Sequence, residues 1–391
     1  MNILMINFPA EGHVNPTIGM VKAFTDRGDE VHYITTEKYK ERLEGVGANV
    51  HLHNDWLRTI TPDLYTFEGM NTFLKVHIQT SLETLAITKN LKELYTFDLV
   101  FFDNFGAGEL VRDYLDIPGI SSSSSFLMPD MALKELPFHP QSEASFEPDQ
   151  EAKTQLHNIE KTYGVKPKSL AQFMMNRGEC QIVYTSRYFQ PYSEHFGDHN
   201  IFIGPSFPDR KGAHDFPVEQ LVDELVLYIS MGTVLSDQEA FINACIDAFA
   251  NFDGKVVIST GNYTDESKLK SAPDHFLIAS YVPQLEVLQK ANVFITHGGM
   301  NSVNEAIHHN VPMVVVPHDK DQPMVAQRLE ELGAGYPISK DSITTATLQG
   351  AVQEVINDEQ YKQNIEKINQ SFKESGGVEK ALREIDAFLG K

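Results

Sequence analysis

The residues with the most specific chemistry in this sequence are a histidine and two glycines, His297-Gly298-Gly299. Apolar residues 292–296 predict a strand before them, and residues 300–309 predict a helix after them. Glycine lets a ligand approach the backbone because it has no Cβ atom. The free N–H groups and the dipole at a helix start then favour an anion. This arrangement predicts a pyrophosphate site, with His297, Asn301 and Ser302 as further donors.

Three other predicted strands of the same half of the chain end on residues that suit such a site. In open α/β sheets, ligands bind outside the carboxyl ends of the strands, so several strand ends converge on one place. Each candidate taken alone also fits a strand-end turn, core packing or a solvated helix start. The candidates are Ser230, Gly232 and Thr233 for the phosphates, Tyr281 and Gln284 for a flat base, Glu305 for ribose hydroxyls, and Asp321 and Gln322 for sugar hydroxyls.

A second set of residues suits acid–base chemistry. His13 follows the first predicted strand, and Asp103 ends the strand predicted over residues 98–103. Both positions fall on the same edge of a parallel sheet, so the two side chains can meet. A histidine titrates near neutral pH, which suits a general base, and an aspartate behind it fixes the tautomer and stabilises the imidazolium. For His13 alone, a capping or packing role is the alternative.

The elements that must position these residues follow a βαβ pattern typical of parallel sheets. Residues 204–217 are rich in Pro, Gly and charge, and we interpret them as part of a linker. We therefore predict an α/β fold with two doubly wound domains, residues 1–204 and 221–375, joined by residues 205–220. Helices include residues 16–27 and 105–115. Strands are predicted over residues 2–8, 31–36, 49–53, 98–103, 119–123, 181–185, 201–204, 225–230, 255–259, 276–280, 292–296 and 313–316.

Composition narrows the possible partners. The 391 residues carry a net charge of −22, which opposes binding to nucleic acid or anionic lipid. The only two cysteines, Cys180 and Cys245, are expected to be buried small hydrophobes. No apolar run approaches the roughly 18 residues of a membrane span, and the first residues lack the basic start of a signal peptide, so we expect a cytoplasmic protein without stable membrane insertion.

Together these pieces resemble the nucleotide-sugar signature of UDP-glycosyltransferases with the GT-B fold (glycosyltransferase family 1). The resemblance is greatest to Bacillus-type members and to bacterial macrolide and flavonoid glycosyltransferases. It extends to the first half of the chain, where an acceptor-side motif is matched. The matching residues are Tyr281-Val-Pro-Gln-Leu-Glu-Val-Leu288, Thr296-His-Gly-Gly-Met-Asn-Ser302, Glu305, Pro317 to Asp321-Gln322, and Gly12-His13-Val14-Asn15-Pro16.

The resemblance implies two Rossmann-like domains that face each other across a cleft, with the acceptor bound by residues 1–204 and the UDP-sugar by residues 221–375. It implies that a C-terminal helix, residues 376–391, packs back on the first domain. His13 is implied to be the base and Asp103 its support. On the donor side it implies that Tyr281 stacks on uracil, that the Val282 backbone contacts the base and that Gln284 lies beside the nucleoside. The diphosphate contacts are implied to come from His297, Asn301 and Ser302. Glu305 is implied to contact the ribose, and Asp321 and Gln322 the transferred sugar.

We therefore expect an inverting transferase that moves a hexose, most simply glucose, to a hydroxyl of a small hydrophobic acceptor. Backbone N–H groups and His297 stabilise the leaving diphosphate, so no metal or other cofactor is expected. A GT-B sugar-nucleotide epimerase would need no acceptor motif, and a catalytically silent auxiliary protein would need neither His13 nor Asp103. An NAD oxidoreductase is disfavoured because no Gly-x-Gly-x-x-Gly follows the first strand.

Overall fold

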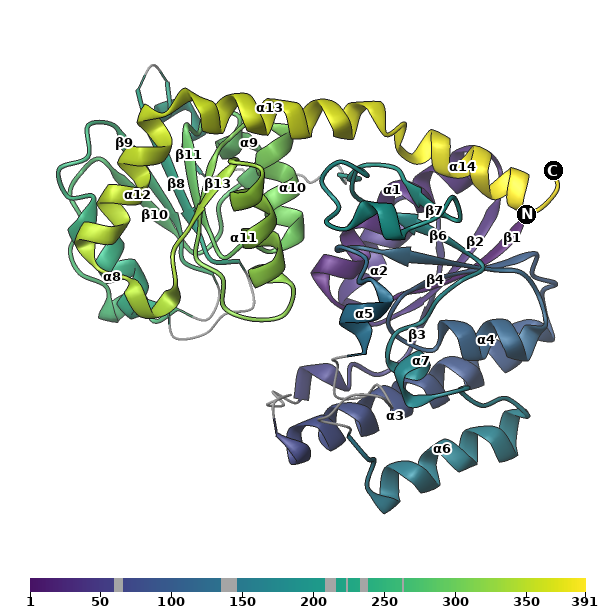
Figure 1. The fold of residues 1–391 in the computed structure, drawn as a ribbon. Helices are drawn as coiled ribbons and strands as arrows, with labels where there is room; N and C mark the ends of the chain where they lie inside the picture. Colours follow the sequence, from purple (N-terminus) through teal and green to yellow (C-terminus); the bar gives the residue numbers. More distant parts are fainter. Residues whose placement is uncertain (60–65, 135–145, 208–215, 223, 233–237, 262–263) are drawn as a thin grey trace. The chain divides into compact units, whose positions relative to one another are not determined.

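The structure is a computed structural model, and it describes residues 1–59, 66–134, 146–207, 216–222, 224–232, 238–261 and 264–391 (Figure 1). The chain divides into two compact units. The first comprises residues 1–208 together with 375–391, and the second comprises residues 209–374. Half of the predicted linker, residues 208–215 of 205–220, lies outside the described residues.

The first unit is built on a parallel seven-stranded sheet with the order β3-β2-β1-β4-β5-β6-β7. The order runs one way from β1 to β3 and the other way from β4 to β7, so it reverses between β1 and β4. Residues 2–6 of β1 pair with β2 on one side and, in part, with β4 on the other. The strands are β1 (Asn2–Ile6), β2 (Glu30–Thr35), β3 (Asn49–Leu52), β4 (Leu99–Asp103), β5 (Gly119–Ser123), β6 (Cys180–Val183) and β7 (Asn200–Phe202).

Helices cover both faces of this sheet. Side chains alternate between the faces of a strand, so Ile3 and Met5 join one core while Leu4 and Ile6 join the other. The first core is closed by α1, α2 and α14, and the second by α3, α4, α6 and α7. The helices are α1 (Glu11–Asp26), α2 (Glu37–Glu44), α3 (Phe67–Lys92), α4 (Gly108–Leu115), α5 (Asp130–Leu133), α6 (Gln150–Tyr163), α7 (Leu170–Met174) and α14 (Gly377–Phe388).

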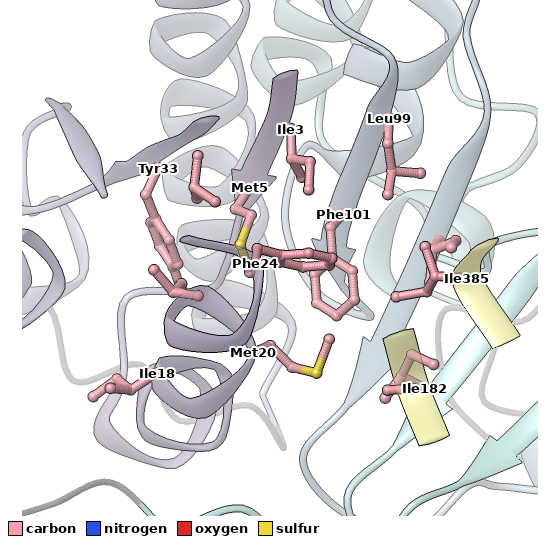
Figure 2. Close-up of a cluster of buried hydrophobic side chains, with 14 of the residues drawn as sticks. Ile3, Met5, Ile18, Met20, Phe24, Tyr33, Leu99, Phe101, Ile182 and Ile385 are labelled. Carbon is pink, nitrogen blue, oxygen red and sulfur yellow. The ribbon is translucent and has the colours of Figure 1, made fainter. Parts of the chain in front are cut away.

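The C-terminal helix α14 is part of the first core. Figure 2 shows Ile385 near Ile182 and Leu99 in the cluster that also holds Phe101. An ion pair at the surface adds to this packing, because Arg27 at the end of α1 lies 2.9 Å from Asp386. The last residues of the chain therefore fold with its first residues.

The second unit repeats the design with a six-stranded parallel sheet of order β10-β9-β8-β11-β12-β13. Here the order reverses between β8 and β11. The strands are β8 (Val226–Ser230), β9 (Lys255–Ser259), β10 (Phe276–Ala279), β11 (Val293–Thr296), β12 (Met313–Val315) and β13 (Gly335–Pro337). The helices are α8 (Glu239–Ala248), α9 (Gln284–Leu288), α10 (Met300–His308), α11 (Gln322–Glu331), α12 (Thr345–Asn357) and α13 (Glu359–Glu374). None of the helices in the described residues is both long and apolar enough to cross a lipid bilayer.

All strands predicted from the sequence are present, with ends that differ by at most two residues, but β13 was not predicted. The predicted first residues of two helices were wrong. The first helix begins at Glu11 rather than Pro16, so the motif around His13 is helical and Pro16 lies inside the helix. The predicted helix over residues 105–115 begins only at Gly108, after a turn.

Acid should weaken this fold through His77, a buried residue of α3. Its Nε2 atom lies 3.0 Å from the Phe173 carbonyl oxygen, and burial lowers its pKa to about 4. An unfolded histidine, with its pKa near 6.5, takes up a proton first as the pH falls, so this contribution to stability is present above about pH 6.5 and is lost toward pH 4.

We therefore expect His77→Gln, which retains a donor but does not titrate, to flatten the pH dependence of stability. Between pH 6.5 and 4.5 the free energy of unfolding of the wild type should fall by about 1–2 kcal/mol more than that of the variant. Urea unfolding followed by circular dichroism measures both. Parallel curves for the two proteins would contradict the assignment.

Candidate active site

His13 and Asp103 meet at the point where the strand order of the first sheet reverses. His13 lies in the first turn of α1, directly after β1, and Asp103 is the last residue of β4. The His13 Nδ1 atom is 2.7 Å from Asp103 Oδ2. The Asp103 side chain is 2% exposed and that of His13 is 22% exposed. The carboxylate is therefore shielded from water, while the imidazole retains access to a ligand.

Donors from two neighbouring residues orient the Asp103 carboxylate. The backbone N–H of Phe105 donates to Oδ1 over 2.9 Å, and the buried Asn7 side chain donates to Oδ2 over 3.4 Å. Because a carboxylate only accepts hydrogen bonds, Nδ1 of His13 must carry the proton. The other ring nitrogen, Nε2, then presents a lone pair, as a general base requires.

Two aromatic rings flank the imidazole of His13. The ring centroids of Phe8 and Phe105 lie 5.2 Å and 5.6 Å from that of His13, both in edge-to-face geometry. Ser124 Oγ lies 3.4 Å from Nδ1. Ser124 belongs to a run of serines, Ser121–Ser125, which by sequence alone fits either pocket lining or a simple loop. Ser121–Ser123 are buried within β5, so Ser124 is the member that reaches the histidine.

Sequence reasoning missed Asn7, Phe8 and Phe105. All three lie within two residues of a strand end, the position that pointed to His13 and Asp103, so that signal was available. It lacked specificity, because an amide or a phenyl ring after a strand is more often part of the core.

In the second unit, the His297 ring packs between Gly232 and Gly299. It follows β11, next to the point where the strand order of the second sheet reverses between β8 and β11. A Cβ atom on Gly232 would lie 2.7 Å from the His297 ring, and one on Gly299 would lie 2.4 Å from it. Both glycines are therefore required for the ring to occupy this position. Burial, together with electrostatic interactions with His318 and Lys320, lowers the pKa of His297 to about 4. The ring is therefore neutral at pH 7 and can offer hydrogen bonds but no positive charge.

The turn before α10 requires glycine at Gly298. Its φ angle is +85°, and a Cβ atom there would lie 2.7 Å from Val315 on the next strand. Gly299 is the N-cap residue, and Asn301 and Ser302 lie in the first turn of α10. The structure therefore places these residues around one helix N-terminus, where backbone N–H groups are free for an anion.

Gln284, Ser302 and Glu305 form one hydrogen-bonded group. The Gln284 amide donates to Glu305 Oε2 over 2.6 Å and to Ser302 Oγ over 3.3 Å, and its oxygen accepts from Tyr228 over 3.0 Å. Glu305 is buried. These contacts fix α9 against α10, so the residues predicted to contact the nucleoside and ribose lie together.

The other predicted donor-site residues have mixed surroundings. Tyr281 is 52% exposed, as an aromatic available for stacking would be, whereas Val282 is buried. Ser230 is buried and its Oγ lies 3.4 Å from the Gly232 nitrogen. Thr233 lies outside the described residues.

The Asp321–Gln322 pair lies at the start of α11, directly after the loop that follows β12. Asp321 is the N-cap residue of α11. The buried Gln322 side chain accepts from the His318 N–H over 2.9 Å and donates to Asp319 over 3.3 Å. Its amide therefore holds the loop after β12, and a sugar would have to share it. Lys320 in that loop has a φ angle of +58°, a strained conformation for a lysine.

The described residues hold no group of three or more His, Cys, Asp or Glu that could bind a metal ion. Metal independence therefore stays a prediction, which chelation tests below.

Comparison with known proteins identifies the class. The family model described as "UDP-glucoronosyl and UDP-glucosyl transferase" matches residues 201–376. The chain is 60% identical over 387 residues to the uncharacterized UDP-glucosyltransferase YdhE of Bacillus subtilis, covering 99% of this chain and 98% of that protein. It is 32% identical to the NDP-glycosyltransferase YjiC of the same organism, covering 100% and 98%.

Among solved structures, the calicheamicin glycosyltransferase CalG4 aligns with a TM-score of 0.81 and 25% identity, over 100% of this chain and 98% of that one. The protein is thus a glycosyltransferase with two α/β domains of the GT-B type. It belongs to the UDP-glucoronosyl and UDP-glucosyl transferase family, which confirms the resemblance identified from the sequence.

The glycines around His297 give a direct test of the donor site. Gly299→Ala should force the ring from its position and weaken UDP binding by about ten- to hundredfold, because overpacking a tight contact costs a few kcal/mol. Isothermal titration calorimetry measures this. Gly350→Ala is the control, since nothing lies within 4 Å of a Cβ atom there and alanine favours the helix. Equal affinities in the two variants would contradict the proposed role of the contact.

Proposed function

We propose that this enzyme transfers glucose from UDP-glucose to a hydroxyl of a small hydrophobic acceptor, such as a flavonoid or a macrolide, with inversion at the anomeric carbon. The observation that carries the proposal is the pairing of His13 Nδ1 with the buried Asp103 carboxylate, because it fixes the tautomer in which Nε2 can accept a proton. The name of the Bacillus relative, a UDP-glucosyltransferase, supports the donor. The name of CalG4, a calicheamicin glycosyltransferase, supports a small-molecule acceptor.

The proposed reaction is a single displacement. His13 Nε2 takes the proton of the acceptor hydroxyl while the oxygen forms a bond to the anomeric carbon. The bond from that carbon to the diphosphate breaks, and its electron pair leaves with UDP. An α-linked donor therefore gives a β-linked product. Asp103 remains ionised and stabilises the imidazolium, and Phe8 and Phe105 restrict how the ring can turn.

The leaving UDP is stabilised by neutral donors in this proposal. The N–H groups at the start of α10 and a neutral His297 donate hydrogen bonds, and they need no reorganisation as charge develops. The sequence predicted that His297 helps to stabilise the leaving diphosphate. We propose that it does so through a hydrogen bond and not through a positive charge. The positive charge nearby belongs to Lys320, which acts on His297 electrostatically.

The first experiment incubates the enzyme with UDP-glucose and a panel of polyphenols and macrolides, and follows UDP release and product mass. A glycoside and one equivalent of UDP are expected. UDP binding without any glycoside would contradict the acceptor assignment. Conversion of UDP-glucose to its epimer would indicate the alternative, a sugar-nucleotide epimerase.

Removing the base should separate catalysis from donor binding. His13→Ala should lower kcat by about 10²–10⁴-fold, the usual contribution of a positioned acid–base group. Asp103→Asn should also lower kcat strongly, because the amide no longer fixes the productive tautomer. UDP affinity should stay unchanged in both variants, as calorimetry would show. Normal turnover of His13→Ala would exclude it as the base.

Chelation tests the predicted absence of a metal. The rate with excess EDTA should equal the rate with added Mg²⁺, because the leaving group is stabilised by protein donors in this proposal. A loss of activity in EDTA that Mg²⁺ or Mn²⁺ restores would show that a metal ion takes part. UDP binding measured under both conditions is the control.

A further inference from the structure

A pocket with no assigned role lies in the first unit. It has a volume of about 690 Å³, within the usual range for small-ligand sites. Its walls are the segments after β2 and after β3 and the second half of α3. Since β2 and β3 continue the sheet from β1, the pocket opens on the same edge as His13. The lining residues that matter here are Thr36, Lys38, His53, Asn54, Glu83 and Ile87.

Hydrogen bonds hold the pocket walls in place. The Glu83 carboxylate accepts from the Asn54 backbone over 2.9 Å, from the Asn54 side chain over 3.0 Å, and from Trp56 Nε1 over 3.0 Å. On the other side, Lys38 lies 3.0 Å from Glu11, which is in the same helical turn as His13. The pocket is therefore preformed and linked to the helix that carries the proposed base.

His53 offers a hydrogen-bond acceptor to this pocket. Its Nδ1 atom is 2.8 Å from the Asn54 carbonyl oxygen, which only accepts, so Nδ1 carries a proton. Burial lowers the pKa of His53, so the ring is neutral near pH 7. Nε2 therefore presents a lone pair, and no partner for it is present among the described residues. Such an atom binds a hydroxyl group and repels a carboxylate.

Thr36 provides a second neutral polar group. It lines the pocket, it is 1% exposed, and within the described part of the chain its Oγ1 atom has no hydrogen-bond partner. Although Thr36 is the N-cap residue of α2, its side chain makes no capping bond. A buried hydroxyl without a partner costs stability, so a rotation of the Thr36 side chain that brings Oγ1 to a ligand hydroxyl in the pocket would be stabilising.

The charges around the pocket disfavour an anionic ligand. The lining has three acidic side chains, Glu37, Asp55 and Glu83, against two basic ones, Lys38 and Arg58. Lys38 is already paired with Glu11, and the whole chain has a net charge of −22. The uncharged lining consists of the polar residues Thr36, His53 and Asn54 and the apolar residues Leu52, Ala86 and Ile87. Neutral hydrogen-bonding groups beside an apolar wall match an uncharged, hydroxylated ring.

We propose that this pocket is an acceptor subsite for such a ring, in particular a sugar already attached to the acceptor. In this arrangement His53 Nε2 accepts from one ring hydroxyl, Thr36 exchanges a hydrogen bond with another, and the apolar side of the ring packs on Ile87. The enzyme would then prefer acceptors that already carry one sugar. This inference rests on the proposed function, since it requires that the free hydroxyl of the acceptor reach His13.

The kinetic test compares a flavonol with its monoglucoside as acceptors of UDP-glucose. The wild type should show a kcat/KM about tenfold higher for the monoglucoside, the gain that one or two hydrogen bonds supply, and mainly through KM. Thr36→Val and His53→Leu should remove this preference and leave the flavonol reaction unchanged. Lys89→Ala, an exposed change elsewhere on α3, is the matched control and should retain the preference.

A binding test separates the subsite from catalysis. Saturation-transfer NMR with methyl β-D-glucoside on the UDP-saturated enzyme should show contact in the wild type and in Lys89→Ala, and less contact in Thr36→Val. Thr36→Val is nearly isosteric and removes no cap, so it tests the site even if His53→Leu fails to fold. Methyl β-D-glucuronide should bind more weakly than the glucoside.

The outcomes are distinct. If the wild type glycosylates no member of the polyphenol and macrolide panel, the proposed function is wrong, and the binding test alone decides the subsite. If both acceptors react equally well and no variant changes their ratio, the subsite is wrong while the proposed function stands. An equal loss with both acceptors in Thr36→Val would also overturn the subsite, because it would indicate a general structural effect. So would tighter binding of the glucuronide.

Discussion

The reversal of strand order inside each parallel sheet is the constraint on which both candidate sites depend. In the first unit, the helix after β1 covers one face and the helix after β4 covers the other, so the two connections separate. The gap at the ends of these central strands is where an α/β sheet binds ligands. His13 and Asp103 occupy it in one unit, and His297 with Gly232 occupies the equivalent place in the other.

The two histidines show how surroundings give one residue type two tasks. His13 is partly exposed and paired with a buried carboxylate, which stabilises its charged form, so it can accept a proton. Among the described residues, no carboxylate is paired with His297. Its ring is enclosed by Gly232 and Gly299 and lies near His318 and Lys320, and its pKa is about 4. It stays neutral and suits hydrogen bonding to a diphosphate. Sequence alone identified both residues, but not this difference in charge.

Much of the fold followed from local patterns, because buried parallel strands are short apolar runs that few other structures produce. The meeting of His13 and Asp103 followed from the same logic, since His13 follows one strand of the sheet and Asp103 ends the neighbouring strand. What failed depended on tertiary context. Pro16 suggested a helix start, yet the helix begins at Glu11. The helix therefore tolerates Pro16 in its interior, although the proline removes one backbone hydrogen bond there. The structure also adds a contact that the sequence did not suggest, because the Gln322 amide holds the loop before α11. The short edge strand β13 contains a proline, which usually argues against a strand.

An acidic protein that binds an anionic donor must do so through short-range interactions. With a net charge of −22, the long-range field opposes the approach of a nucleotide diphosphate. In the proposed donor site around α10, such interactions would come from backbone N–H groups, a neutral imidazole and the nearby Lys320. Hydrogen bonds of this kind depend on direction and distance, so they select a diphosphate in one position rather than any anion. The close packing of Gly232 and Gly299 on His297 is consistent with that demand, because donors that act only at short range must be held in place before the ligand arrives.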